Sequence, residues 1–476
     1  MELPFHKIGE VTFELPAKFR PGMRVSVRVL ADEALLEQVT RDKSIEQLIN
    51  VSTLPGITQF AIGMPDMHQG YGFPVGGVAG TVLPDGVISP GGIGFDINCG
   101  VRLLASVLDA RALGSLESLV HELSRAIPVG YGRSGRIALE RGELDKVLAG
   151  GCTYLVRDLG MGVPADLDFI ESRGTLADAD PGQVSERAKE RGHDQLGTLG
   201  GGNHFLEVQI VDTIFDEAAA RALGLFHGQL TVLIHTGSRG LGHQVCTDHV
   251  RVMDRALTKH HITLPDRQLA CAPFSSREGK EYFAAMCAAA NFAWANRQAL
   301  THRVREVFDR MLGAREDARL SLVYDVAHNI AKLERFDEHT LCIHRKGATR
   351  AFGPSSNEIP PRYREVGQPV LIPGSMGTSS FVMVGEDTSK DVSLSSSCHG
   401  AGRAMSRHAA KAKVEGHVLR RELEAKGIVV RCPSNAELAE EAPFAYKDVE
   451  RVVDVVARAG VARKVARLRP LGVLKG

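Results

Sequence analysis

Gly94-Phe95-Asp96-Ile97-Asn98-Cys99-Gly100 is a glycine-bounded segment that carries a carboxylate and a thiol three residues apart. The segment is too rich in glycine for a long helix, so it predicts a tight turn in which Asp96 and Cys99 wrap around one metal ion. The alternative is an Asp that closes an Asx turn beside a buried Cys. If the first interpretation holds, further ligands must come from other parts of the chain.

Short apolar runs alternate with longer periodic stretches on both sides of this turn. Strands are predicted where β-branched residues gather, at 25–30, 230–234, 320–324 and 370–372. Helices are predicted where apolar residues recur with the helical period, at 110–125, 280–312, 402–425 and 447–461. No repeat, low-complexity tract or Pro/Ser-rich linker divides the chain, so strands and helices occur throughout.

The composition is that of an ordinary folded protein. Of 476 residues, 43% are hydrophobic and 24% are charged, which excludes disorder, collagen and a simple coiled coil. The 57 basic and 57 acidic residues cancel, but residues 401–476 hold 16 Lys and Arg against 9 Asp and Glu, a net charge of +7 that suits phosphate binding. The eight cysteines form no CxxC pair, which argues against a zinc ribbon. The N-terminus lacks a secretory signal and no run of 18 apolar residues occurs, so we expect a cytoplasmic protein without membrane contact.

Two glycine-rich loops add histidines close to predicted strands. The loop 197–202 runs into Asn203 and His204, and the strand at 230–234 ends at His235 in front of Arg239. Both histidines are candidate metal ligands, and an arginine in a glycine-rich turn can hold a phosphate bidentately. The alternatives are that His204 is a partly buried, hydrogen-bonded histidine and that Arg239 is solvated beside His235, which acts as a cap.

A further strand end supplies His328, which follows the predicted strand at 320–324. Asp325 precedes it and is a candidate to orient an imidazole through a hydrogen bond. A strand-end histidine bonded only to backbone is the alternative.

The last of these loops, 395–402, contains His399 and opens the helix predicted at 402–425. A helix N-terminus that follows glycines favours phosphate, so His399 is a candidate base, ligand or nucleophile toward phosphorus. A solvated basic helix face, with Arg403 and Arg407, is the alternative interpretation.

Taken together, the loops and strand ends supply five candidate ligands: Asp96, Cys99, His204, His235 and His328. This number exceeds a single structural zinc site and favours two ions that share a ligand, the usual arrangement for in-line phosphoryl transfer. His399 is left without a metal role. A thiolate with imidazoles would ordinarily suggest zinc. P-loop, Lys-x-Asp-Gly, HExxH, GxSxG and protein-kinase motifs are absent from the sequence.

The ordered motifs GFDINCGVR, GGGNHFLE, HTGSRGLGH, AHN and SCHGAGR resemble those of the RtcB-type RNA-splicing ligases, with a match from about residue 60 to Lys475. The resemblance implies an α+β fold, a single compact body of mixed β-sheets with flanking helices over residues 1–476. It also implies a ligase that depends on GTP and two Mn²⁺ ions and joins RNA 3′-phosphate or 2′,3′-cyclic phosphate ends to 5′-hydroxyl ends. Such an enzyme acts through a histidine–GMP intermediate and an RNA-(3′)pp(5′)-G end, in tRNA splicing or RNA repair.

The resemblance also assigns roles to particular residues. One Mn²⁺ would be bound by Asp96, Cys99 and His204, the other by Cys99, His235 and His328, and His399 would carry GMP. Asp66 lies in a further family motif near the site. The implied nucleotide contacts are Asn203, Phe205, Glu207, His328, Asn329, Pro373, Gly374, Ser375, Met376, Ser380, His399, Gly400, Ala401, Gly402, Tyr446 and Lys475.

RNA is the implied partner, with an archease-type activator protein as a further one. Candidate contacts to RNA phosphates are Arg239, Arg403 and Arg407, which lie in or beside the matched motifs. Two other classes of protein use similar residues. A metal-dependent phosphoesterase or nuclease would use the same ions without a nucleotide, and an RNA-binding protein would use one structural metal.

Overall fold

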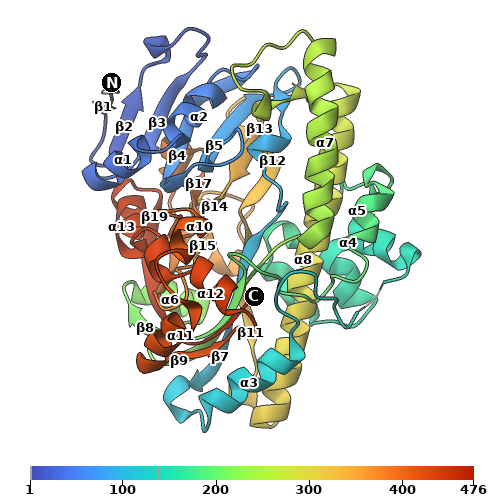
Figure 1. Ribbon diagram of the computed structural model, residues 1–476, viewed down its shortest axis with the longest axis vertical. Helices are drawn as coiled ribbons and strands as arrows, with labels where there is room; N and C mark the ends of the chain where they lie inside the picture. The colour runs from blue at the N-terminus through green and yellow to red at the C-terminus, as the bar shows by residue number, and fades with distance from the viewer. Residues whose placement is uncertain (1–2, 138) are drawn as a thin grey trace.

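Two large β-sheets form the centre of the computed structural model, which describes residues 3–137 and 139–476 (Figure 1). In the first sheet β3 and β4 pair in parallel, connected through α1 (Glu33–Thr40) and α2 (Ser44–Val51), and the other neighbours pair antiparallel. The strand order is β1 (His6–Lys7), β2 (Thr12–Leu15), β3 (Ser26–Leu30), β4 (Ile57–His68), β5 (Val75–Val82), β13 (His339–Lys346) and β12 (Asn329–Phe336).

The second sheet is antiparallel along its main path, and β18 (Val429–Arg431) adds to β19 in parallel. One of its interior strands, β9 (Gln229–Thr236), is buried along its whole length, as the apolar run at 230–234 predicts. The strand order is β11 (Ser321–Ala327), β7 (Gly100–Asp109), β9 (Gln229–Thr236), β8 (Phe205–Ile214), β19 (Ala462–Lys475), β16 (Ser380–Gly385) and β15 (Pro369–Ile372).

Two short antiparallel strand pairs lie beside these sheets: β6 (Val87–Ile88) with β10 (Ala272–Pro273), and β14 (Ala348–Arg350) with β17 (Ser396–Cys398). The second pair matters for the site. Its register places Cys398 opposite Ala348, so His399 comes next to the end of β13.

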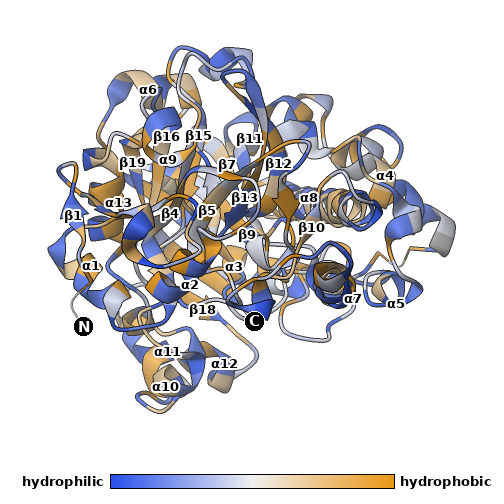
Figure 2. Ribbon diagram, turned by 90° about the horizontal axis from the view of Figure 1, so that it is seen from above, coloured by the Kyte–Doolittle hydropathy of each residue, from blue (hydrophilic) through white to orange (hydrophobic). Residues whose placement is uncertain are grey.

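Helices α7 (Arg239–Lys259) and α8 (Arg277–Leu312) run along one side of the sheets in Figure 1 and are seen nearly end-on in Figure 2. The hydroxyl of Ser276 caps α8 by accepting from the Gly279 N–H at 3.1 Å. The alanine-rich middle of α8 is buried on all sides, because small side chains let sheet, loops and neighbouring helices approach closely. This burial makes α8 a central support of the fold.

The other helices are α3 (Leu116–Ala126), α4 (Arg141–Arg157), α5 (Glu186–Glu190), α6 (Glu217–Leu223), α9 (Ser389–Ser393), α10 (Arg407–Lys411), α11 (Gly416–Ala425), α12 (Asn435–Glu440) and α13 (Val449–Arg458). They pack either on the sheets or on one another, with α4 against α8 and α5 against α7. No described helix has the length and apolar character to cross a membrane.

The predicted α+β class is confirmed, as are the four strands and the helices at 280–312 and 447–461. The helix predicted at 110–125 is confirmed only from Leu116 onward, because Asp109 caps a 3₁₀ turn and Ser115 then caps the separate helix α3. The helix predicted at 402–425 is likewise confirmed only in part. Ser406 caps a short α10, the backbone is extended at Glu415, and α11 follows. His399 therefore follows strand β17 and does not precede a helix N-terminus.

Candidate active site

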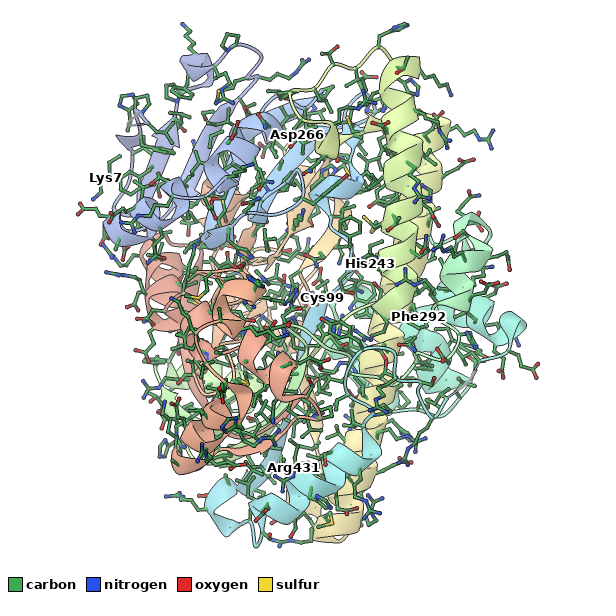
Figure 3. The ribbon with its side chains drawn as sticks, viewed as in Figure 1. Lys7, Cys99, His243, Asp266, Phe292 and Arg431 are labelled. Carbon is green, nitrogen blue, oxygen red and sulfur yellow. The ribbon has the colours of Figure 1, made fainter. Side chains whose placement is uncertain are left out.

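The ends of both large sheets meet at a cavity of about 400 Å³. Figure 3 shows Cys99, which lines this cavity, near the middle of the view. Most of the predicted residues line it together: Asp96, Cys99, Asn203, Phe205, His235, His328, Asn329, Pro373, Gly374, Ser375, Met376, His399, Gly400, Ala401, Gly402, Arg403, Arg407, Tyr446 and Lys475.

The five candidate ligands form two triads that share Cys99. The Cys99 Sγ lies 3.3 Å from Nε2 of His204 and 3.4 Å from Nε2 of His235, whose Nε2 lies 3.2 Å from that of His328. One triad is Cys99, His235 and His328, and the other is Asp96, Cys99 and His204. The Oδ2 atom of Asp96 lies 2.8 Å from Nε2 of His204. Within each triad the candidate donor atoms lie within 4.8 Å of one another. Segments about 230 residues apart in the sequence thus converge on one thiol.

The chemistry of these donors fits metal ions. Burial and the neighbouring histidines hold the pKa of His235 and that of His328 well below the usual value, so both rings stay neutral with lone pairs available. Burial and the Asp96 carboxylate raise the pKa of the Cys99 thiol, so a thiolate forms there only beside a cation. Two neutral imidazole nitrogens 3.2 Å apart also need a shared cation or proton between them.

The carboxylate of Asp96 is held in place from behind. The Ser238 backbone N–H donates to Oδ1 of Asp96 at 3.0 Å, which leaves Oδ2 directed at His204. Burial raises the pKa of Asp96, but the field of His204 and Arg239 outweighs burial, so the pKa is lowered and the carboxyl group remains ionised.

Arg239 lies behind His204 and outside the cavity lining. Its Nη1 is 2.8 Å from Nδ1 of His204, and its Nε donates to the hydroxyl of Thr198 at 3.3 Å. The carbonyl of Leu199 lies 3.1 Å from the same Nδ1, so that nitrogen either accepts a hydrogen bond from Arg239 or donates one to Leu199, but not both. The second tautomer leaves Nε2 of His204 free to bind a metal.

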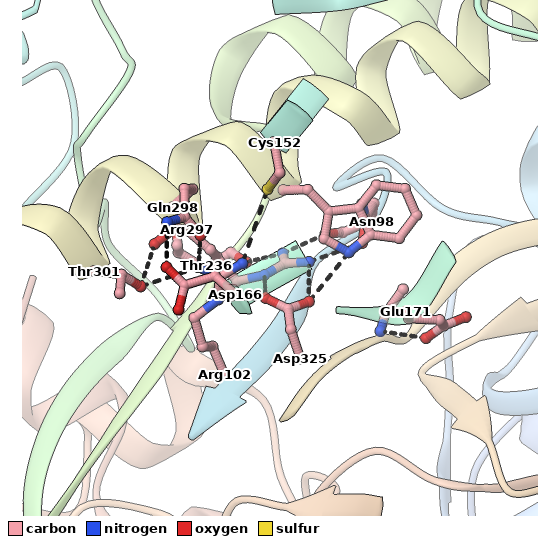
Figure 4. A network of polar contacts seen from close by, with 12 residues as sticks. Asn98, Arg102, Cys152, Asp166, Glu171, Thr236, Arg297, Gln298, Thr301 and Asp325 are labelled. Atoms are coloured by element: carbon pink, nitrogen blue, oxygen red, sulfur yellow. Dashed lines mark hydrogen bonds and ion pairs between the residues drawn. The ribbon is translucent and has the colours of Figure 1, made fainter. Parts of the chain in front are cut away.

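A buried ionic network joins helix α8 to segments that carry candidate ligands (Figure 4). Arg297 of α8 donates to Asp325 at 2.8 and 3.0 Å, to the Asn98 carbonyl at 2.8 Å and to the Thr236 carbonyl at 2.9 Å. Arg102 donates to the same Asp325 carboxylate at 2.7 Å. Asp325 was expected to orient an imidazole, but this is wrong, because two guanidinium groups and Trp294 occupy its oxygens.

Asp66 is the partner of His399. Its Oδ2 lies 2.6 Å from Nδ1 of His399, in a close contact not aligned as a hydrogen bond, and it accepts the His399 backbone N–H at 3.2 Å. The His399 ring centroid is 4.9 Å from that of His328. Nδ1 thus faces a fully buried carboxylate, and Nε2 is the ring nitrogen that does not face it.

Glu207 and Ser380 lie outside the cavity lining but connect to it through Gln209. Gln209 Nε2 donates to Glu207 at 2.7 Å and to the Ser380 hydroxyl at 3.2 Å, and that hydroxyl accepts from the Gly374 N–H at 3.2 Å. The other oxygen of Glu207 is buried without a partner among the described residues. Burial raises the pKa of Glu207 to about 8, against the weaker effects of Gln209 and Lys475.

Sequence reasoning missed Glu441, which organises the basic side of the cavity. It accepts from Arg403 at 3.2 Å, from Arg407 at 2.8 Å and from the Tyr446 hydroxyl, and Lys475 Nζ lies 4.0 Å away. An acidic residue in a polar stretch gives no sequence signal of burial.

Two other lining residues were also missed, His68 and Lys346. Lys346 is buried at the end of β13, where its ammonium donates to the carbonyls of Tyr71, Phe73 and Gly91. Burial lowers its pKa to about 7. A lysine that ends an apolar strand in front of a glycine was the available signal.

The profile of the tRNA-splicing ligase RtcB family matches residues 47–476. The chain belongs to this family. It is 53% identical to the tRNA-splicing ligase RtcB of Archaeoglobus fulgidus over the full length of both chains. It is 52% identical to the protein of the same name from Thermococcus kodakarensis, over all of this chain and 99% of the relative. The RNA-splicing ligase RtcB of Mycobacterium tuberculosis is 50% identical over 90% of this chain and its own whole length.

Proposed function

We propose that this protein is an RNA ligase that uses GTP and Mn²⁺ to join RNA 3′-phosphate or 2′,3′-cyclic phosphate ends to 5′-hydroxyl ends. The whole chain acts as one domain, in tRNA splicing or the repair of broken RNA. Membership of the tRNA-splicing ligase family supports the reaction class. The finer steps are those that the family resemblance implies, and the geometry of the cavity supports them.

The observation that carries the proposal is the position of His399, which lines the cavity together with four of the five candidate ligands but belongs to neither triad. A histidine needed only as a ligand would point its nitrogen at Cys99. His399 instead turns Nδ1 to Asp66 and lines the cavity beside His328. This arrangement suits a nucleophile that acts next to metal ions.

Asp96, Cys99 and His204 would hold one Mn²⁺, and Cys99, His235 and His328 the other. When bound, these ions neutralise phosphate oxygens on which charge develops during transfer. Thiolate and imidazole ligands also suit zinc, so the preference for manganese derives from the family resemblance alone.

The reaction begins with His399. Its Nε2 forms a bond to the α-phosphorus of GTP, pyrophosphate leaves, and Asp66 stabilises the imidazolium through Nδ1. An oxygen of the RNA 3′-phosphate then attacks that phosphorus and displaces the imidazole, which gives an RNA-(3′)pp(5′)-G end. The RNA 5′-hydroxyl attacks the RNA phosphorus, loses its proton, and GMP leaves. A 2′,3′-cyclic phosphate must first be opened by water.

Glu207 is the proposed reader of guanine. The free oxygen of its buried carboxyl group can accept a hydrogen bond from the base edge, and guanine presents donors at N1 and N2. The hydrogen-bonded chain through Gln209 and Ser380 ties Glu207 to the loop that begins at Pro373 and lines the cavity.

The test is covalent labelling with α-³²P-GTP in the presence of Mn²⁺. The wild-type protein is expected to retain an acid-labile label, because a phosphoramidate hydrolyses in acid. His399→Ala is expected to lose the label while binding metal normally, and His408→Ala, on the partly exposed helix α10, serves as the control. A label that persists in His399→Ala would place GMP on another residue. No label in the wild type would favour a nuclease or phosphoesterase.

A further inference from the structure

The loop between α3 and α4 presents an aromatic ring between arginines. Residues 129–136 read Val-Gly-Tyr-Gly-Arg-Ser-Gly-Arg, and this segment is called the Tyr131 loop below. The side chain of Tyr131 is 61% exposed, and Arg133 and Arg136 are exposed as well. Alternation of aromatic and cationic side chains is typical of surfaces that bind single-stranded nucleic acid.

The ring of Tyr131 lies at the rim of the cavity. A Cβ built on Gly201 would lie 2.7 Å from Cε2 of Tyr131, so the ring packs directly on the backbone of the turn that leads to Asn203. A Cβ on Gly202 would lie 2.8 Å from the Tyr131 hydroxyl and 3.0 Å from Nη2 of Arg407. Tyr131 and Arg407 thus meet over one glycine turn, and Arg407 and Asn203 line the cavity.

The loop is anchored on the same segment that carries His204. The Gly130 N–H donates to the Gly200 carbonyl at 3.0 Å, and the Ser134 hydroxyl donates to Asp194 at 2.6 Å. Gln195 donates to the Arg133 carbonyl at 3.1 Å. These bonds hold the ring in place before any ligand arrives, which lowers the entropy cost of stacking.

Both signs of charge lie near the ring. Burial raises the pKa of Tyr131, the Arg407 guanidinium lowers it, and the carboxylates of Glu441, Glu437 and Glu440 raise it. The guanidinium of Arg133 has no ion-pair partner within the described residues, and that of Arg136 donates only to the Arg125 carbonyl, at 2.8 Å. The nearby carboxylate of Glu441 is already paired with Arg403 and Arg407. Two guanidinium groups therefore remain available to phosphates beside an exposed aromatic face.

We propose that the Tyr131 loop binds the unpaired end of the RNA substrate, with the Tyr131 ring stacked on a base and Arg133 and Arg136 on flanking phosphates. This inference rests on the proposed function, since it names the form of RNA that the cavity receives. A base inside a duplex already stacks on its neighbours, so the ring selects unpaired ends over paired ones. Because every base has a flat face, the selection carries little sequence preference.

The test measures binding of a fluorescein-labelled, unstructured oligoribonucleotide with a 3′-phosphate by fluorescence anisotropy. Tyr131→Ala is expected to raise Kd about tenfold or more, whereas Tyr131→Phe keeps the aromatic face and stays near wild type. Phe226→Ala, which removes another exposed ring, is the matched control. Arg133→Ala is expected to reduce the slope of log Kd against log salt by about 1.

The same variants are labelled with α-³²P-GTP, which reports whether the nucleotide site has folded. Equal RNA affinity of Tyr131→Ala and wild type would overturn the inference. It would also be overturned if Tyr131→Ala lost affinity equally for a blunt RNA duplex and for the single strand. A wild type that binds RNA through Tyr131 but takes no label from GTP would contradict the proposed function and leave the Tyr131 loop assignment standing. The two failures are therefore distinguishable.

Discussion

Cys99 is the single side chain on which both triads depend. Its thiol lies 3.3 Å from His204, which belongs to one triad, and 3.4 Å from His235, which belongs to the other. We expect Cys99→Ser to lose metal affinity and activity by orders of magnitude, because a hydroxyl group deprotonates far less readily than a metal-bound thiol. Metal content by mass spectrometry and binding by calorimetry check this. Cys246→Ser, a buried thiol outside the triads, is the control, and normal metal content in Cys99→Ser would remove the thiol from the site.

Glu207 determines the base preference in the proposed function. Glu207→Gln keeps the shape of the side chain but places a donor amide where guanine also presents donors. We expect the preference for GTP over ATP to narrow by about 1 to 3 kcal/mol, because the variant can turn a donor amide, in place of the free acceptor oxygen, toward the guanine edge. Competition between the two nucleotides in the labelling reaction measures this. An unchanged ratio would place guanine recognition elsewhere, such as on backbone groups.

The same residue predicts a pH dependence of stability in the nucleotide-free protein. Burial raises the pKa of Glu207 from 4.5 to about 8. Between these values the unfolded chain has lost the proton and the folded chain keeps it, so stability falls as pH rises, by up to about 1.4 kcal/mol per pH unit. Glu207→Gln should remove this part of the decline in denaturant unfolding at pH 5 to 8. If the free energy of unfolding falls with pH equally in the two proteins, the Glu207 carboxyl group is ionised in the folded protein.

Individual residues were predicted from sequence where a polar side chain stood in an unusual loop. His204, His235, His328 and Cys99 each follow or precede a strand or glycine turn, and they converge as the motifs suggested. Nothing in the sequence signals the burial of Glu441, and the signal for Lys346 is weak, because the burial of both residues depends on partners far away in the sequence. Tyr131 likewise becomes informative only when the glycine turn beneath it is seen.

At the scale of elements, helix α8 joins the ligand-bearing segments through Arg297. Its guanidinium bonds to the carbonyls of Asn98 and Thr236, next to Cys99 and His235, and to Asp325, three residues before His328. A residue on one helix thereby fixes three segments at once. Replacement of the Arg297 guanidinium should therefore disturb the triads, although no candidate ligand is changed.

We expect Arg297→Lys to weaken metal binding and to lower the free energy of unfolding by about 1 to 3 kcal/mol, since an ammonium cannot replace the planar fork. Arg305→Lys is the matched control, because Arg305 also lies on α8 and pairs with a buried carboxylate, Asp166, at 2.7 Å. The control should lose stability but bind metal normally. Equal metal affinity in both variants would show that Arg297 supports only the fold.

The elements themselves were predictable where one local signal dominated. Strand β9 and helix α8 follow from an apolar run and a long periodic stretch. The helices predicted at 110–125 and 402–425 were right only in part, because Ser115 and Ser406 cap new helix starts inside a periodic pattern. Hydrophobic period alone does not show where a side chain competes with the helix for a backbone N–H.

At the scale of the whole molecule, the chain carries no net charge, yet residues 401–476 are basic, with a net charge of +7. This part of the chain contributes Arg403, Arg407 and Lys475 to one side of the cavity. Glu441 neutralises some of that charge locally. The remaining field is suited to steer an RNA backbone toward His399 rather than to hold it tightly.

The chemistry of His399 then dictates which RNA ends can be joined. If GMP is transferred from His399 to a 3′-phosphate, the attacking group must be a free 5′-hydroxyl, and a 5′-phosphate would block it and add about two negative charges beside the activated end. With Mn²⁺ and GTP, RNA with 3′-phosphate and 5′-hydroxyl ends should be ligated, and ligation should stop when the 5′ end is phosphorylated and weaken as salt rises. Gel analysis of end-labelled RNA checks each case. Efficient joining of 3′-hydroxyl to 5′-phosphate ends would contradict the mechanism, because that polarity requires activation of the other terminus.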